Sequence, residues 1–237
     1  MNKKTVLITG GARRIGAAIT EYFAKQNYNI IINYLQSKKN AHQLANNINN
    51  AGGRAVPFKA DVTNCNEIKD LFEYAAKEFQ CIDVLINNAG MFPTKKTLAE
   101  LKFTEYLETL TLNMHSAMIT TKEFIKHTNL IDGRIVNISS LGGINIFEQH
   151  IDYNVSKAGL IRLTQVLAKE LAPNISVNCI CPGIVQVDDE NINFPTEKIP
   201  MQRFATTEDI TATIDFFVNG PIYITGQIIS ISGGMEL

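Results

Sequence analysis

The chain opens with the stretch Thr5-Val6-Leu7-Ile8-Thr9-Gly10-Gly11-Ala12-Arg13-Arg14-Ile15-Gly16, an apolar strand, a glycine-rich turn and the start of a helix. Glycines in such a turn let the backbone pass close to a ligand, and the helix N-terminus offers free N–H groups to a phosphate. A tight turn that only packs on a sheet would use the same glycines. The strand before the turn and the helix after it favour a dinucleotide-binding turn.

The rest of the chain repeats this alternation of strand and helix. Apolar runs of strand length cover Thr5–Thr9, Asn29–Tyr34, Ala55–Phe58, Val84–Ile86, Arg134–Ile138, Ser176–Ile180 and Gln227–Ile231. Helical patterns cover Arg14–Gln26, Lys39–Asn50, Asn66–Phe79, Phe103–His127, Tyr153–Leu171 and Thr207–Phe217. Continuous apolar strands between helices predict a doubly wound α/β domain of Rossmann type, with a mostly parallel seven-stranded sheet and helices on both faces.

Composition narrows the class of protein further. The 237 residues are 45% apolar and 19% charged, which suits a single domain, because single domains extend to about 250 residues before splitting. The formal net charge of -1 gives no global positive field for nucleic acid or an anionic membrane. No apolar run approaches the ~18 residues that span a bilayer, and the first one is too short for a secretion signal. We therefore expect a cytoplasmic protein without nucleic-acid or membrane partners.

The four cysteines give no indication of a metal site. Cys65, Cys81, Cys179 and Cys181 lack zinc-ligand spacing, so we expect buried free thiols and no metal site.

The segment Gly183–Arg203 has no periodicity and lies between a strand and the last helix. Loops of this length are commonly lids or binding loops, and we interpret it as the substrate loop, about residues 183–203, of a single domain spanning 1–237.

Three residues are candidates for a catalytic role. Tyr153 and Lys157 are four positions apart at the start of a predicted helix and therefore share one face. A nearby ammonium stabilises tyrosinate, so we expect Lys157 to lower the pKa of Tyr153 from its ordinary value of about 10. Ser140 follows a predicted strand, where its hydroxyl could hold a carbonyl oxygen. Singly these residues suit ordinary surface positions, but with the glycine turn they indicate proton transfer to a carbonyl.

The cofactor preference is indicated near the end of the second strand. A carboxylate there would bind the ribose diol of NAD, whereas cations favour the 2′-phosphate of NADP. The segment from Asn33 to Lys39 contains no Asp or Glu, and Arg13 adds a guanidinium suited to phosphate. NADP(H) is therefore the expected cofactor. Lys38 and Lys39 fit a solvated helix start equally well.

The ordered motifs resemble those of classical short-chain dehydrogenases/reductases over essentially the whole chain. They are Thr9-Gly10 with Gly16, Asp61-Val62, Asn87-Asn88-Ala89-Gly90, Asn113, Ser140, Tyr153-Asn154-Val155-Ser156-Lys157, Pro182-Gly183, and Ile224-Thr225-Gly226 with Gly233-Gly234. Tyr153 follows Ser140 by thirteen positions, the family's usual separation, which selects Ser140 over Ser139.

The resemblance implies a catalytic tetrad of Asn113, Ser140, Tyr153 and Lys157. Tyr153 would protonate the substrate oxygen while hydride arrives from the nicotinamide, and Ser140 would orient the carbonyl. Lys157 would hold the nicotinamide ribose and tune Tyr153, and Asn113 would position a water that relays protons. Substrate would contact Phe92, Ser140 and Tyr153.

The resemblance also implies a set of cofactor-binding residues. These are Gly10, Arg13, Arg14, Ile15, Tyr34, Ser37, Asp61, Val62, Asn88, Ala89, Gly90, Tyr153, Lys157, Pro182, Gly183 and Val185. Asp61 would meet the adenine amino group and Val62 the adenine ring. The segment from Asn88 to Gly90 would line the adenosine ribose and floor the site, although packing at a strand end explains it equally well.

Departures from the family pattern leave the substrate open. Arg14 replaces the usual middle glycine of the turn, as in pteridine reductases, and Phe92 resembles the aromatic that stacks on pterin in those enzymes. Ser140, however, stands where pteridine reductases usually carry Asp, and Val187 replaces a common threonine that binds the nicotinamide carboxamide. The leading interpretation is reduction of a ketone or a 3-oxoacyl thioester, with a pteridine reductase as the alternative. A catalytically silent dinucleotide-binding scaffold is a third, and the presence of both Tyr153 and Lys157 argues against it.

The same resemblance implies a homo-oligomer. Related proteins commonly form homodimers or homotetramers in which two long helices pack against their symmetry mates. Here these would be the predicted helices Phe103–His127 and Tyr153–Leu171. Apolar residues on those helices fit an intramolecular core as well.

Overall fold

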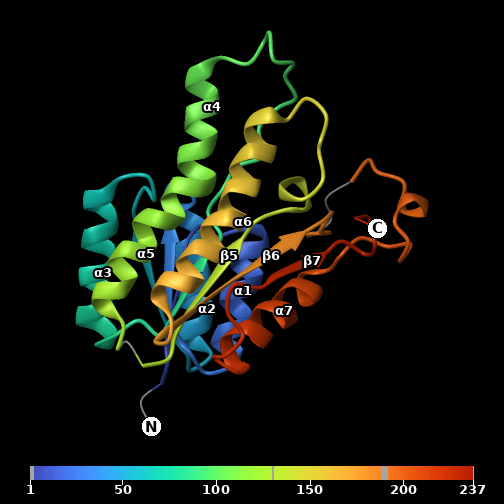
Figure 1. The fold of residues 1–237 in the computed structure, drawn as a ribbon. Coiled ribbons are helices and arrows are strands. Elements are labelled where there is room, and N and C mark those ends of the chain that lie inside the picture. The colour runs from blue at the N-terminus through green and yellow to red at the C-terminus, as the bar shows by residue number, and fades with distance from the viewer. Residues whose placement is uncertain (1–2, 130, 188–191, 237) are drawn as a thin grey trace.

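The chain folds around one twisted β-sheet flanked by helices (Figure 1). The computed structural model describes residues 3–129, 131–187 and 192–236. The strands, all parallel, have the order β3-β2-β1-β4-β5-β6-β7 in a seven-stranded sheet. Their bounds are β1 Thr5–Ile8, β2 Asn29–Tyr34, β3 Arg54–Lys59, β4 Val84–Asn87, β5 Gly133–Ile138, β6 Ile175–Pro182 and β7 Ile228–Ile231. The predicted fold class is confirmed.

The direction of chain winding reverses between β1 and β4. Leu7 of β1 pairs with Ile31 of β2 on one side and with Leu85 of β4 on the other. In doubly wound sheets the crevice at the carboxyl ends of the strands beside such a reversal is where ligands bind. The glycine turn after β1 and the segment from Asn88 to Gly90 after β4 both lie at this edge.

Helices cover both faces, and each face has its own apolar core. The helices α1 Arg14–Lys25, α2 Lys38–Asn50 and α7 Thr207–Asn219 pack on one face. The helices α3 Cys65–Phe79, α5 Ser116–His127 and α6 Ile151–Leu171 pack on the other. Successive strand residues point to opposite faces, so Ile30 and Ile32 enter the first core and Ile31 the second. This explains why the strands appear in the sequence as unbroken apolar runs.

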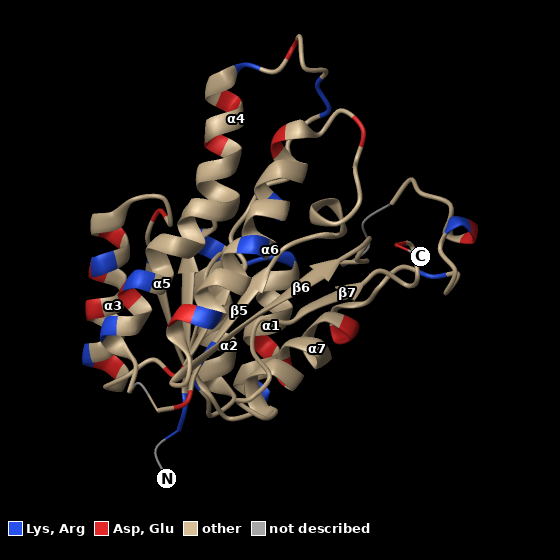
Figure 2. Cartoon of the chain, in the orientation of Figure 1, with Lys and Arg blue, Asp and Glu red and all other residues tan. Residues whose placement is uncertain are grey.

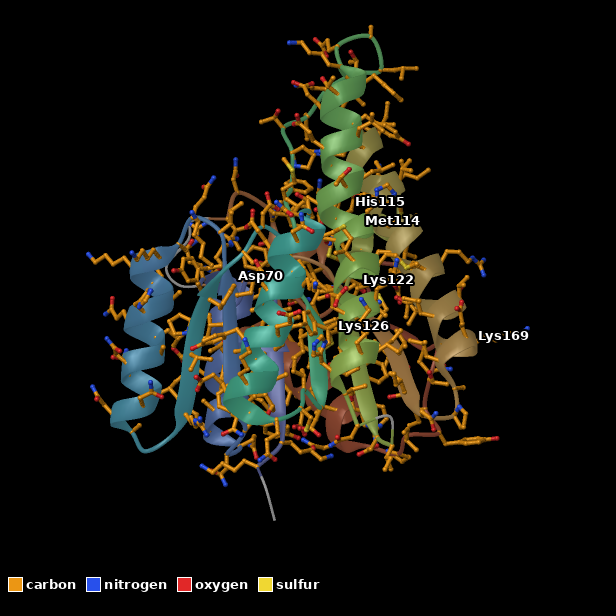
Figure 3. All side chains as sticks on the ribbon, turned by 90° about the vertical axis from the view of Figure 1, so that its left-hand side faces the viewer. Asp70, Met114, His115, Lys122, Lys126 and Lys169 are labelled. Carbon is orange, nitrogen blue, oxygen red and sulfur yellow. The ribbon has the colours of Figure 1, made fainter. Side chains whose placement is uncertain are left out.

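The predicted helix Phe103–His127 is divided in the structure. It consists of α4 Phe103–Leu110, a π-helical turn at Thr111–His115 and α5. The three segments still form one continuous column beside α6, and α4 extends beyond the sheet (Figure 1). In the side view, the labelled and exposed Lys122, Lys126 and Lys169 mark the outer surface of α5 and α6 (Figure 3). The π-turn contains Asn113, one of the predicted catalytic residues.

The remaining segments complete the domain. Short 3₁₀ turns occur at Leu141–Gly143 and Thr196–Lys198. β3 is an edge strand, and Pro57 within it pairs with Ile32. The predicted substrate loop includes residues 188–191, which lie outside the described residues; of the rest, Val185 forms a parallel bridge with Ala205.

The charged side chains are distributed over the helices without segregation of sign. Lys and Arg alternate with Asp and Glu along α3, for example (Figure 2), which suits the net charge of -1. Within the described ranges, no helix combines the length and the apolarity needed to cross a membrane.

Candidate active site

The glycine turn is held open by two asparagine side chains. Gly10 has a φ of +60°, a left-handed conformation that favours glycine. Its N–H donates to Asn33 Oδ1 at 3.2 Å, and the Asn88 amide donates to the carbonyls of Thr9 at 2.9 Å and Gly10 at 3.2 Å. A Cβ on Gly16 would collide with the Gly10 carbonyl. The turn therefore has one well-defined shape, with its backbone accessible from the carboxyl edge of the sheet.

Asn33 is a site residue that the sequence analysis did not single out. Besides accepting from Gly10, its amide donates to the Ala60 carbonyl at 2.9 Å, which links the ends of β2 and β3 to the turn. It is buried, and it lines the cleft described next. A polar residue that directly follows the three buried isoleucines of β2 was the available signal.

One cleft of about 950 Å³ brings most of the predicted cofactor residues together. Thirteen of the sixteen line it: Gly10, Arg13, Arg14, Ile15, Tyr34, Ser37, Asp61, Val62, Asn88, Ala89, Gly90, Tyr153 and Lys157. Its volume is at the upper end of the range for small-molecule and cofactor sites, about 300–1,000 Å³. The cleft therefore runs from the β2 end, past the glycine turn, to the tyrosine and lysine of α6.

The other three predicted cofactor residues, Pro182, Gly183 and Val185, are not among the residues that line that cleft. Pro182 ends β6 and is buried, and the Gly183 N–H donates to the Ile231 carbonyl of β7 at 3.0 Å. Val185 is partly buried and packs against the apolar core of the face that α1, α2 and α7 cover. Main-chain hydrogen bonds thus hold this segment against β7 and Ala205.

The cleft end near β2 carries cations. Arg13 and Arg14 are both exposed, and Arg14 has a φ of 53°, the conformation that the family's usual glycine adopts readily. The Tyr34 hydroxyl lies 3.4 Å from His42 Nε2. Ser37 directly precedes α2. Asp61 lines the cleft too, but its Oδ1 accepts hydrogen bonds from the Thr63 N–H at 2.9 Å and hydroxyl at 2.7 Å.

Tyr153 lines the other end of the cleft, and the buried Ser140 lies beside it. Tyr153 is the third residue of α6, and Ser140 comes two residues after β5. Burial raises the pKa of the Tyr153 phenol, and a hydrogen bond with the Ser140 side chain opposes that rise to a smaller extent. Ser140 Oγ also accepts from the Gly142 N–H at 3.1 Å, which fixes the position of its hydroxyl.

Lys157 is buried beneath the phenol ring. Its ammonium lies 5.9 Å from the centroid of the Tyr153 ring and donates to the Ile138 carbonyl at 2.9 Å. Burial lowers the lysine pKa from 10.5 to about 8. We expected Lys157 to lower the pKa of Tyr153, but the tyrosine pKa is raised, because desolvation is the largest influence on it.

Asn113 joins the cleft floor to α6 from within the π-turn. Its Oδ1 accepts from the Met91 N–H at 2.8 Å, while its amide donates to the Met91 carbonyl at 3.0 Å and to Ser156 Oγ at 3.1 Å. A Cβ on Gly90 would lie 3.1 Å from Asn113 Oδ1 and 3.5 Å from Lys157 Nζ. The side chain thus anchors the loop after β4 next to the lysine, and π-turns occur frequently at functional sites.

Aromatic rings surround Tyr153. The Phe92 ring lies 4.7 Å from the Tyr153 ring, centroid to centroid, and 4.5 Å from the His150 ring. The Phe147 ring is nearly parallel to that of Tyr153 at 6.4 Å. Burial, and to a smaller extent the ammonium of Lys95, lower the pKa of the His150 imidazole. Phe92 was predicted from the sequence, whereas His150 and Phe147 were not.

The four cysteines are free thiols that differ in their burial. Cys179 and Cys181 are buried, Cys81 is half-buried, and Cys65 is exposed at the start of α3. The expectation of a buried thiol is therefore wrong for Cys65, which occupies the first turn of an amphipathic helix. Among the residues that the structure describes, no three His, Cys, Asp or Glu side chains are grouped so that they could hold a metal ion.

Comparison with known proteins assigns the family. The profile of the short chain dehydrogenase family matches residues 4–198. A 3-oxoacyl-[acyl-carrier-protein] reductase from a Synechocystis species is 34% identical, covering 100% of this chain and 98% of the relative. Glucose 1-dehydrogenase 2 from Bacillus subtilis is 30% identical, covering 99% and 95%. A short chain dehydrogenase from Burkholderia cenocepacia, solved in complex with NADP, is 29% identical with a TM-score of 0.92, covering 100% and 99%.

The chain belongs to the classical short-chain dehydrogenase/reductase family, in the branch that resembles 3-oxoacyl-[acyl-carrier-protein] reductases. It is thus an oxidoreductase by family, with a nicotinamide dinucleotide as the family's cofactor.

Proposed function

We propose that this protein is an NADP(H)-dependent reductase of a carbonyl substrate, with Tyr153 as its general acid and base. The observation that carries the proposal is the position of Tyr153 and Lys157 at one end of a cofactor-sized cleft, with the Ser140 side chain hydrogen-bonded to Tyr153. The cleft lies at the sheet edge where doubly wound folds bind ligands. The whole chain forms one NADP-binding domain, in which residues 183–203 act as the substrate loop.

The residues along the cleft fit an NADP molecule. The exposed backbone of Gly10 and the start of α1 at Arg14 and Ile15 suit a pyrophosphate. Arg13, Arg14, Tyr34 and Ser37 form a cationic and hydroxyl-rich end suited to the 2′-phosphate. The adenine and the two riboses, with the nicotinamide, would contact the cleft residues Asp61, Val62, Asn88, Ala89, Gly90, Tyr153 and Lys157. We expect further contacts from Pro182, Gly183 and Val185, outside the cleft lining. The NADP complex of the Burkholderia cenocepacia relative supports this choice of cofactor.

The chemistry divides between cofactor and chain. NADPH, when bound, would supply the hydride for the carbonyl carbon. Ser140, fixed by the Gly142 N–H, orients the carbonyl oxygen, and Tyr153 donates its proton to that oxygen, so that an alcohol results. The raised pKa keeps the phenol protonated and ready to donate. Lys157 would hold the nicotinamide ribose and return a proton to Tyr153, and Asn113 would position the water that supplies this proton.

Carbonyl reduction is tested by NADPH oxidation with a panel of substrates. The panel contains simple ketones and diketones, acetoacetyl thioesters, and dihydropterin with biopterin. Turnover of ketones or thioesters is the expected result. Pterin turnover would establish the second candidate, which Arg14 and Phe92 favour and Ser140 disfavours. Absence of turnover throughout the panel would favour the silent scaffold and refute the proposal.

Cofactor preference is tested separately by fluorescence titration. With cations and no carboxylate between Asn33 and Lys39, NADPH is expected to bind much more tightly than NADH. Equal affinities would refute the assignment of NADP(H).

A homodimer or homotetramer completes the proposal. Four apolar side chains on three helices are 42–51% exposed: Leu107 on α4, Met118 on α5, and Val155 and Val166 on α6. Exposed apolar side chains on neighbouring helices are suited to packing against a second copy. Light scattering after size exclusion should give twice or four times the 26.3 kDa monomer mass, and a monomer at micromolar concentration would contradict this.

A further inference from the structure

The two phenylalanine rings beside Tyr153 have different surroundings. Phe92 lies 4.7 Å from the Tyr153 ring, lines the cleft and is 61% exposed. Phe147 lies 6.4 Å from the same ring, nearly parallel to it with 11° between the planes, and is outside the cleft lining. A carbonyl whose oxygen reaches the phenol therefore meets an open side at Phe92 and a walled side at Phe147.

The walled side is closely packed through Gly142. A Cβ on Gly142 would lie 2.9 Å from two carbons of the Phe147 ring and 3.0 Å from Cε1 of Tyr153. Contacts this short leave no room for even a methyl group between the backbone and the rings. Gly142 belongs to the same 3₁₀ turn that Ser140 caps, so the wall and the carbonyl-orienting hydroxyl are parts of one small structure.

Asn154 holds this wall against the catalytic helix. Its amide donates to the Phe147 carbonyl at 2.8 Å, and its Oδ1 accepts from the Phe147 N–H at 3.2 Å. Both backbone polar groups of Phe147 are thereby bound to the residue that follows Tyr153 in α6. A paired contact of this kind fixes the ring relative to the phenol more firmly than apolar packing alone.

The open side has room for a larger group. One part of the Phe92 ring packs on His150 at 4.5 Å, and more than half of the side chain is accessible to solvent. Asn113 ties the neighbouring Met91 in the same bidentate way as Asn154 ties Phe147. Both sides are therefore held in place, and the difference between them is one of available space.

We infer that Asn154 is a positioning residue that, through Phe147, closes one side of the carbonyl site and makes the enzyme selective for ketones with one methyl-sized and one larger substituent. The inference rests on the proposed function. The larger group lies toward Phe92 and the small group toward Phe147. Only one face of such a ketone is then presented to the hydride, so the alcohol forms as one enantiomer.

The test uses a series in which only the small substituent grows: 1-phenylethanone, 1-phenylpropan-1-one and 1-phenylbutan-1-one. For the unaltered enzyme, kcat/KM should fall by at least about 10-fold along the series, since one or two methylenes in a closed pocket have effects of that order. Chiral chromatography should show one predominant enantiomer of each alcohol. Phe147→Ala should flatten the series and lower the enantiomeric excess.

Asn154→Ala should reproduce this loss of selectivity although it leaves the Phe147 side chain intact. Asn154→Asp keeps the acceptor for the Phe147 N–H and should retain an intermediate selectivity. Asn145→Ala is the matched control, because Asn145 lies in the same segment but bonds to the Met235 carbonyl at 3.4 Å. Its series and enantiomeric excess should not change. Circular dichroism confirms that each variant is folded.

Unchanged selectivity in folded Phe147→Ala and Asn154→Ala enzymes would overturn the inference. Binding of the same ketones to the NADP⁺-loaded protein, measured by calorimetry, separates it from the proposed function. A binding preference for the methyl ketone without any turnover would count against the proposed function alone. Equal binding along the series, or no binding of any ketone, would overturn the inference itself.

Discussion

Replacing Lys157 by methionine should stabilise the protein at neutral pH. Burial lowers the lysine pKa from 10.5 to about 8, and at ~1.36 kcal/mol per pKa unit this corresponds to a cost of roughly 3 kcal/mol while the ammonium is charged. Methionine has a similar shape and no charge. It forfeits the hydrogen bond to the Ile138 carbonyl, worth about 1 kcal/mol. The net expectation is about 2 kcal/mol of added stability at pH 7.

The pH dependence of this effect follows from the direction of the shift. Below pH 8 Lys157 is charged in both the folded and the unfolded state, so the whole cost is present. Between pH 8 and 10.5 the folded protein releases its proton while the unfolded chain still holds one, and stability rises with pH. By pH 9.5 the remaining cost is about 1.4 kcal/mol, and the advantage of Lys157→Met over the unaltered protein should be close to zero.

Urea unfolding at fixed protein concentration, from pH 6.5 to 9.5, measures both quantities. In a separate thermal unfolding experiment at neutral pH, the melting temperature should rise by about 4–8 °C, given ~2–4 °C per kcal/mol for a domain of this size. Lys169→Met is the matched control, because Lys169 is exposed on the same helix. Its stability should change by less than about 0.5 kcal/mol at every pH. A Lys157→Met variant that is less stable at pH 7, or whose advantage does not vary with pH, would refute this account of the buried ammonium.

Three further predictions concern the site. Tyr153→Phe removes the transferable proton and should lower kcat by about 10²–10⁴-fold in NADPH oxidation assays, with NADPH affinity by titration nearly unchanged; full turnover would exclude the proposed acid. Arg13→Ala should weaken NADPH binding by about 10-fold, the range of one charge-assisted contact to phosphate, while NADH binding stays within about twofold; equal losses would place Arg13 away from the 2′-phosphate. Asn33→Ala leaves the Gly10 N–H and the Ala60 carbonyl without their partner and should cost about 2–3 kcal/mol in urea unfolding, whereas a loss below 0.5 kcal/mol would show that Asn33 does not hold the turn.

The sheet could be predicted because its strands are buried on both faces. Val6-Leu7-Ile8 and Ile30-Ile31-Ile32 are fully buried and appear in the sequence as unbroken apolar runs. The π-turn at Thr111–His115 could not be predicted in this way. One inserted residue leaves the apolar pattern on either side intact, so the segment resembles a single long helix.

The site was predictable where motifs carry it and not where packing does. The motifs identified the residues of the glycine turn, Tyr153 and Lys157, and the structure places them in one cleft. The direction of the Tyr153 pKa shift depends on how deeply the phenol is buried, which residue spacing does not contain. The contacts of Asn33 with the turn and of Asn154 with Phe147 are likewise determined by tertiary structure. Each of these asparagines has ordinary neighbours in the sequence.

Pro57 in the edge strand β3 protects the protein against misassembly. A parallel sheet ends in strands whose outward amides and carbonyls can recruit another chain. Proline has no amide hydrogen, so the outer margin of β3 lacks a donor at the position paired with Ile32 on its inner side. At the opposite margin β7 is only four residues long. Neither edge strand therefore offers a long, regular row of hydrogen-bonding groups to an incoming strand. The two edges thus limit the aggregation that the isoleucine-rich strands would otherwise favour.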